Sequence, residues 1–177
     1  TYNRENNVVQ DLVRGNFYWE GGIKDSKVMF KHEHNGRFLI SWMPPKELQN
    51  GNENTFNWGV WAKSPLNGHI GAFGCDPYDI SGTTESVKSS DDSDELGGRG
   101  SKGALSGVTC FNMMDIPSNM FFLEYVSRPT TDEMFFEDML MACVFYSMPI
   151  LIENNKPRLL YHFKNRGYRH YSITRFD

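Results

Sequence analysis

The clearest pattern in the chain is a series of short apolar runs after residue 68, separated by turns and by segments with helical spacing. Residues 70–75, 107–113, 120–126 and 149–152 have the length and apolar content of strands. A helix is expected after the third run, because Thr130 and Glu133 form a capping box. Its apolar face is formed by residues at helical spacing: Phe136, Met139, Leu140, Cys143, Val144 and Ser147.

A second helix over residues 157–165, closed by Gly167, and a last strand over 171–174 complete this pattern. The expected order is therefore three strands, a helix, a strand, a helix and a strand. Three consecutive strands can pair as a meander, whereas strands separated by helices join a parallel sheet through crossovers. The sequence thus predicts a mixed α/β sheet, with a three-strand meander followed by parallel strands and flanked by helices.

Residues 1–67 have a weaker pattern and are predicted to be a lead-in to this domain. Residues 7–15 suit a short helix. The alternating runs 28–32 and 37–42 are separated by a segment ending in Asn35-Gly36, which predicts a β-hairpin. Residues 47–57, rich in Asn and Gly, are expected to be an exposed connector. The division is therefore 1–67 for the lead-in and 68–177 for the main domain.

Two acids stand where apolar strands end. Asp76 follows the run 70–75, and Pro77 prevents that strand from continuing. Glu153 follows the run 149–152 and precedes a turn. If these strands are parallel neighbours, both carboxylates converge, and a divalent cation between them makes the arrangement favourable. The alternative is that each acid only ends a strand in a surface turn.

Composition narrows the class of protein. Aromatic residues make up 14% of the 177 residues, which argues against a disordered chain, and the net charge is −4. No apolar run approaches the roughly 18 residues of a membrane span, and no signal segment opens the chain. Cysteines are few and scattered in apolar runs, which favours free thiols in a reducing compartment: Cys75, Cys110 and Cys143.

Positive charge is concentrated near the end of the sequence. Residues 156–175 contain no acid, and aromatic residues alternate with six basic ones: Lys156, Arg158, Lys164, Arg166, Arg169 and Arg175. A basic, aromatic-rich segment directly after Glu153 suits a phosphate backbone and predicts a DNA contact. The alternative is a solvated basic helix face.

The two acidic motifs and the order of elements between them resemble a known family. Residues 74–79, GCDPYD, are similar to the strand-end D-P motif of the nuclease domain of the large terminase subunit of tailed bacteriophages. Residues 150–155, ILIENN, are similar to its E-x-N motif. The resemblance covers residues 68–177 and implies a ribonuclease H-like fold.

This resemblance implies a metal-dependent DNA endonuclease that cuts concatemeric double-stranded DNA during viral genome packaging. Asp76 would bridge two Mg²⁺ or Mn²⁺ ions, and Glu153 would bind one of them. Asp79 is either a further ligand or the cap of its own turn. The implied partners are the ATPase motor domain of the same subunit, the small terminase subunit and the portal, in the cytoplasm of the host cell, with no membrane.

The sequence also departs from the family. No residue matches the family's third acid, which is expected beyond residue 177, so two acids alone should bind metal weakly. No Walker motif is present, so the motor domain is not part of these residues. Two other functions stay open: another ribonuclease H-like nuclease, such as a transposase, integrase or resolvase core, and a non-catalytic α/β interaction module.

Overall fold

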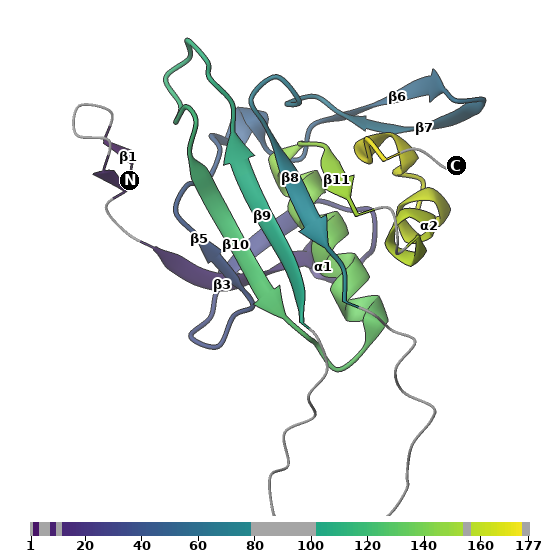
Figure 1. Cartoon of the computed structure of the whole chain (residues 1–177), viewed down its shortest axis with the longest axis horizontal. Coiled ribbons are helices and arrows are strands. Elements are labelled where there is room, and N and C mark those ends of the chain that lie inside the picture. The colour runs from purple at the N-terminus through teal and green to yellow at the C-terminus, as the bar shows by residue number, and fades with distance from the viewer. Residues whose placement is uncertain (1, 4–7, 10–11, 79–101, 154–156, 175–177) are drawn as a thin grey trace, which may run out of the picture.

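The structure is a computed structural model that describes residues 2–3, 8–9, 12–78, 102–153 and 157–174 (Figure 1). Its second half has three strands, an α-helix, a strand and an α-helix in the predicted order, without the last predicted strand. The strands are β1 (Tyr2–Asn3), β2 (Val8–Val9), β3 (Val13–Trp19), β4 (Val28–His32), β5 (Phe38–Ile40), β6 (Asn52–Asn57), β7 (Val60–Pro65), β8 (Gly71–Asp76), β9 (Gly103–Thr109), β10 (Phe121–Ser127) and β11 (Ile150–Ile152). The α-helices are α1 (Asp132–Tyr146) and α2 (Arg158–Asn165), and the short 3-10 helices are η1 (Glu20–Gly22), η2 (Lys46–Leu48) and η3 (Arg169–Tyr171).

Seven strands form one mixed sheet in the order β11-β8-β9-β10-β5-β3-β4. The strands β8, β9 and β10 are an antiparallel meander, and β11 returns after α1 to lie parallel to β8. This confirms the predicted mixed α/β class. The strand predicted over residues 171–174 is reduced to one parallel bridge between Ser172 and Ile150. In this segment the Ile173 backbone N–H still donates to the Ile150 carbonyl oxygen at 3.0 Å, whereas the carbonyl oxygens of Ser172 and Thr174 accept bonds from Arg169.

The N-terminal half also contains a β-hairpin, but its strands differ from the predicted ones. The strand β4 pairs with β3, and β5 pairs with the opposite edge of β3, so the strands 28–32 and 37–42 do not pair with each other. The turn itself forms, because the Gly36 backbone N–H donates to the Glu33 carbonyl oxygen at 3.0 Å, but the strands on either side of it pair with β3. A Cβ atom on Gly36 would collide with the backbone of Gly15 in β3.

The sheet therefore includes strands from both sides of the predicted boundary at residues 67 and 68. The helix predicted over residues 7–15 is also wrong where the structure describes it, since Val8–Val9 is β2 and β3 begins at Val13. Residues 52–57, predicted as a connector, form β6 and pair with β7. No α-helix in the described ranges is long and apolar enough to cross a membrane.

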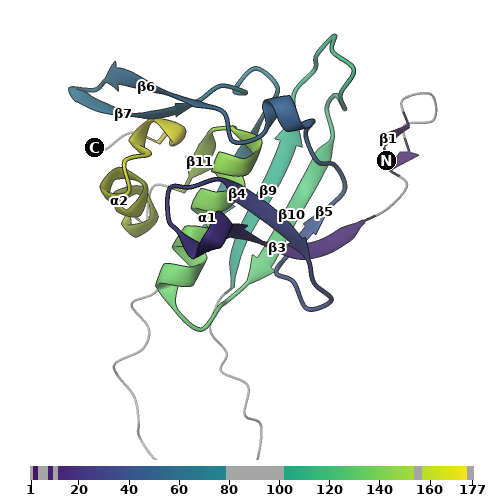
Figure 2. The same ribbon diagram turned by 180° about the vertical axis from the view of Figure 1, so that it is seen from behind.

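The helix α1 is the centre of the core. Figure 1 shows β8 and β9 on one side of it, and the reverse view in Figure 2 shows β3 and β4 over the other side. Every residue from Phe135 to Tyr146 is buried, so after its first turn the helix is buried on all sides and not only on the predicted apolar face. The helix starts one residue later than predicted, because the Thr131 hydroxyl accepts the backbone N–H of Met134 at 3.2 Å.

Candidate active site

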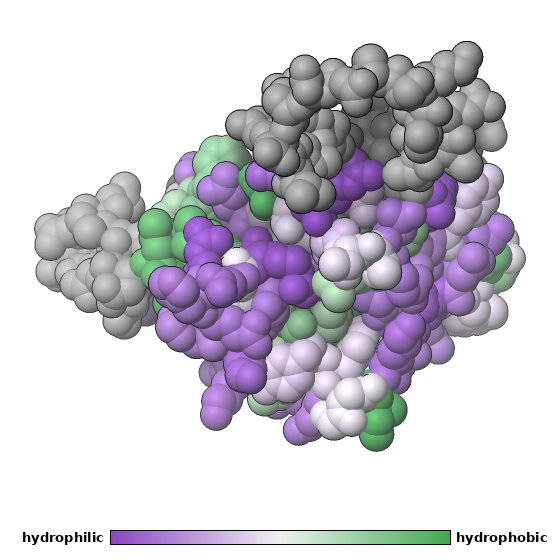
Figure 3. All heavy atoms as spheres, turned by 90° about the horizontal axis from the view of Figure 1, so that it is seen from below, coloured by the Kyte–Doolittle hydropathy of each residue, from purple (hydrophilic) through white to green (hydrophobic). Residues whose placement is uncertain are grey.

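The parallel pairing of β11 with β8 brings Asp76 and Glu153 to the same end of the sheet. Ile152 is the register partner of Cys75, and the Glu153 backbone N–H donates to the Cys75 carbonyl oxygen at 3.2 Å. The acids directly follow this last pair, so they stand at neighbouring carboxyl ends, as the sequence predicted for parallel neighbours. Both are exposed. Figure 3 views the molecule from this end, where the described residues are mostly hydrophilic.

The local sequence explains why the acids are held at fixed backbone positions. Cys75 and Ile152, the residues before them, are 6% and 2% exposed and anchor the two strand ends in the core. Pro77 then removes a backbone donor and ends β8. A carboxylate that follows an anchored strand is well positioned yet reaches solvent, which a metal ligand requires. Asp79, the other predicted ligand, lies outside the described residues.

The turn after Asp76 is anchored by Tyr78, which is only 3% exposed. Its hydroxyl donates to Asp132 at 2.9 Å, and its ring makes an edge contact with Phe135, 5.0 Å between centroids. The guanidinium of Arg128 lies 4.9 Å from the ring centre. Burial and the bond to Asp132 raise the pKa of Tyr78 to about 12, so this tyrosine stays a hydrogen-bond donor at neutral pH.

Asp132 also connects this turn to the segment that follows Glu153. Arg158, the first residue of α2, lies 3.5 Å from the carboxylate of Asp132. The first turn of α1 thus contacts both chain segments that leave the sheet beside the two acids. This contact connects the segments that follow the two candidate ligands, in addition to the sheet itself.

The predicted DNA-binding residues separate into three groups. Lys156 and Arg175 lie outside the described residues. Arg158 and Lys164 are exposed on α2, which starts beside the Glu153 end of β11. Arg166 and Arg169 instead bond inside the protein, and we assign both to the support of the fold.

Arg166 bridges two acids that are distant in sequence. Its Nε donates to Glu137 at 2.7 Å, and its Nη1 donates to Asp25 at 2.9 Å. Arg169 is 5% exposed and lies under the Trp58 ring, with its guanidinium 4.4 Å from the ring centre. Neither guanidinium is presented to a phosphate backbone in this arrangement.

A second group with the chemistry of a metal site surrounds Glu137, and the sequence prediction missed it. Ligand atoms of Glu133, Glu137 and His162 all lie within 4.8 Å of one another, so by geometry they can hold a metal ion. One sequence feature could have indicated this group: Glu133 and Glu137 are four residues apart on a predicted helix, so they lie on the same face of it. The partner His162 follows 25 residues after Glu137, and that separation has no local pattern.

The donors of this group already have protein partners. Glu137 accepts bonds from the Trp19 indole at 2.9 Å, from His162 at 2.9 Å and from Arg166 at 2.7 Å. Burial alone would raise the pKa of Glu137, but these bonds outweigh it and hold the pKa far below its ordinary value. A guanidinium in contact with the same carboxylate supplies the positive charge that a metal would supply. We therefore interpret this group as an ion-pair network.

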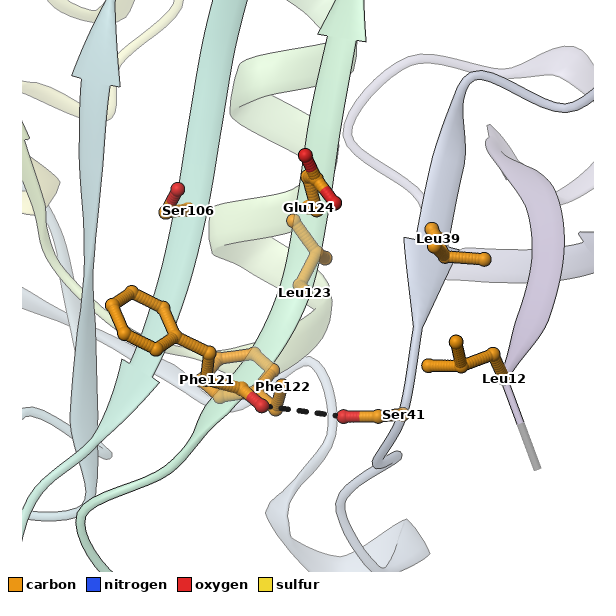
Figure 4. A pocket seen from close by; sticks show the side chains of 8 residues that line it. All are labelled: Leu12, Leu39, Ser41, Ser106, Phe121, Phe122, Leu123 and Glu124. Atoms are coloured by element: carbon orange, nitrogen blue, oxygen red, sulfur yellow. Dashed lines mark hydrogen bonds between the residues drawn. The ribbon is translucent and has the colours of Figure 1, made fainter. Parts of the chain in front are cut away.

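A separate pocket of about 330 Å³ lies over β10 and β5 on the sheet (Figure 4). Its lining is largely apolar, and Ser41 closes one side by donating to the Phe121 carbonyl oxygen at 3.3 Å. The remaining lining residues are Leu12, Leu39, Ser106, Phe122, Leu123 and Glu124. Neither Asp76 nor Glu153 lines it, so this pocket is distinct from the acidic end of the sheet.

Comparison with known proteins does not identify a family for this chain: no family model, no curated protein and no solved structure matches it.

Proposed function

We propose that this chain is the nuclease domain of a viral DNA-packaging terminase, a metal-dependent endonuclease that hydrolyses phosphodiester bonds of double-stranded DNA. The observation that carries the proposal is the placement of Asp76 and Glu153 at adjacent carboxyl ends of two parallel strands. Ligands are commonly bound at the carboxyl ends of strands in α/β sheets. Two exposed acids at such an end match the ligand chemistry of Mg²⁺ or Mn²⁺.

The topology supports a ribonuclease H-like reading of the fold. The part of the sheet that contains the acids has the order β10-β9-β8-β11, an antiparallel meander with a parallel strand added beside its first strand. The helix α1 makes the crossover between β10 and β11. This arrangement agrees with the fold implied by the two sequence motifs.

In the proposed mechanism, Asp76 and Glu153 would hold divalent cations through carboxylate oxygens. When bound, a pair of such cations would supply activation of the attacking water and stabilisation of the leaving oxygen of the phosphodiester. The anchored strand ends keep both carboxylates in place before DNA binds. Arg158 and Lys164, exposed on α2, would contact phosphates beside the site.

The partners, the cellular location and the substrate are part of the same proposal. The domain would work beside an ATPase motor domain of the same subunit, with the small terminase subunit and the portal, in the host cytoplasm. Its substrate would be concatemeric viral DNA. Asp79 would be a further ligand, as the resemblance to the terminase family implies.

Binding of Mn²⁺ followed by electron paramagnetic resonance tests the proposed site without requiring catalysis. We expect Asp76→Asn and Glu153→Gln each to weaken Mn²⁺ binding by more than about tenfold, as loss of a ligand should. Glu124→Gln is the matched control, because Glu124 is an exposed acid on β10 of the same sheet. Equal binding by all three variants, or no binding by the parent, would contradict the proposal and favour a non-catalytic interaction module.

A further inference from the structure

The first residue of α1, Asp132, lies at the end of the sheet where Asp76 ends β8 (Figure 1). Its two carboxylate oxygens have different partners. Oδ1 accepts the hydroxyl of Tyr78 at 2.9 Å, and Oδ2 lies 3.5 Å from Nη1 of Arg158. Because Tyr78 is two residues after Asp76 in sequence, the bond to Oδ1 reaches the turn that directly follows a candidate metal ligand.

The helix gives Asp132 a fixed position. The Thr131 hydroxyl caps the first turn of α1, and every residue from Phe135 to Tyr146 is buried in the core. A carboxylate in the first turn is also favourable because it faces the positive end of the helix dipole. The Asp132 side chain is 34% exposed, so it is a well-positioned acceptor at the rim of the core.

Tyr78 connects this acceptor to the turn after Asp76. Its side chain is 3% exposed and packs edge-on against Phe135, while its backbone leaves the sheet. A buried hydroxyl that loses its acceptor is unfavourable, so without Asp132 the Tyr78 side chain should move toward water. Only Pro77 separates Tyr78 from Asp76, and its φ is fixed by the ring, so such a movement also shifts the backbone of Asp76.

A metal ligand is sensitive to a shift of this kind. Mg²⁺ requires near-ideal octahedral geometry, and a carboxylate binds it well only when its own supports hold it in place. Residues that orient the ligands therefore change metal affinity although they do not touch the metal.

We propose that Asp132 is a positioning residue of the candidate metal site, and that it acts through Tyr78 to hold the Asp76 carboxylate where a divalent cation binds. The inference rests on the proposed function, because it concerns a ligand named there. It gives Asp132 no contact with metal or DNA. The competing explanation is that Asp132 attracts the cation by its charge alone, without the bond to Tyr78.

The test is Mn²⁺ binding followed by electron paramagnetic resonance. We expect Asp132→Ala and Tyr78→Phe each to weaken binding by about threefold to tenfold, at or below the lower end of the effect typical of residues bonded directly to ligands. The double variant should bind no more weakly than either single one, because both changes remove the same bond. Asp132→Asn keeps an acceptor oxygen but removes the charge, so it should bind within about twofold of the parent.

Glu133→Ala is the matched control, because Glu133 is the next acid in the same turn of α1 and is 60% exposed. It removes the same charge from the helix start and should bind Mn²⁺ like the parent. Urea unfolding of all variants separates a purely structural role, which lowers stability without changing the Mn²⁺ affinity of the folded protein.

Parent-like affinity in Asp132→Ala, or losses that add in the double variant, would overturn this inference alone, provided that Asp76→Asn still weakens binding. Equal losses in Asp132→Ala and Asp132→Asn, or in Asp132→Ala and Glu133→Ala, would also overturn it, because charge and not the bond to Tyr78 would then be responsible. No Mn²⁺ binding by the parent would overturn both this inference and the proposed function.

Discussion

The substitution Glu137→Gln tests whether the buried group around Glu137 supports the fold. Glu137 joins three distant parts of the chain, since Trp19 lies in β3 and both His162 and Arg166 lie in or next to α2. The side chains of Glu137 and Arg166 are 9% and 15% exposed, so their ion pair is largely withdrawn from water. Glutamine keeps the size of the side chain but removes its charge.

The expected magnitude follows from the partner that remains. Removing one member of a buried ion pair costs about 3–5 kcal/mol, because the other charge stays buried without compensation. Arg166 retains Asp25, whose side chain is 42% exposed, so part of the compensation survives. We therefore expect Glu137→Gln to lower the free energy of unfolding by about 2–4 kcal/mol.

Urea unfolding followed by circular dichroism measures this change. The control is Glu133→Gln, one turn earlier on α1, where the side chain is 60% exposed and the expected loss is below about 0.5 kcal/mol. Equal losses in the two variants would refute the reasoning. A metal-dependent rise in melting temperature that both substitutions abolish would show instead that Glu133, Glu137 and His162 bind metal.

Three further predictions follow from other contacts. The pKa of Glu137 is lower in the folded protein than in the unfolded chain, so its stabilisation is complete above the unfolded pKa of about 4.3 and is lost as the pH falls. The free energy of unfolding should therefore fall less steeply with decreasing pH in Glu137→Gln than in the parent. Equal slopes would contradict this. Tyr78→Phe should cost roughly 0.5–1.5 kcal/mol by urea unfolding and weaken Mn²⁺ binding less than Asp76→Asn does, and unchanged stability would argue against the bond to Asp132. Gly103→Ala should cost about 1–3 kcal/mol, because its Cβ would collide with the fully buried ring of Phe135, and a neutral result by calorimetry would contradict the packing.

The second half of the fold was predictable because its signals are local. The helical spacing of α1 and the apolar runs of β8 and β11 are each contained in fewer than about 20 consecutive residues. The rule that a helix between two strands leads to a parallel orientation then gives the direction of β11 relative to β10. The prediction that Asp76 and Glu153 lie together also required β11 to be the neighbour of β8, and the structure meets this condition.

The first half depends on contacts between distant residues. The segment of β3 contains Arg14 and Gly15, so it lacks a clear strand pattern. It is a strand because it pairs with β5 on one edge and with β4 on the other. Gly36 closes a turn, as the sequence predicted, but it also lies against the backbone of Gly15 in β3. Such a contact has no signal within a short window.

Contacts between distant residues also limited the functional prediction for the basic segment 156–175. In sequence, Arg166 is one of several cations that suit a phosphate backbone. Its acidic partners, Asp25 and Glu137, are 141 and 29 residues away, and only the fold brings them to it. Local charge therefore predicted a DNA contact where the structure has an internal ion pair.

Nicking of supercoiled plasmid in the presence of Mn²⁺ tests the central claim most directly. We predict that the parent chain converts supercoiled DNA to the open circle, and that Asp76→Ala and Glu153→Ala abolish this while they keep the circular dichroism spectrum of the parent. Absence of cutting by the parent chain, or full cutting by either variant, would contradict the account.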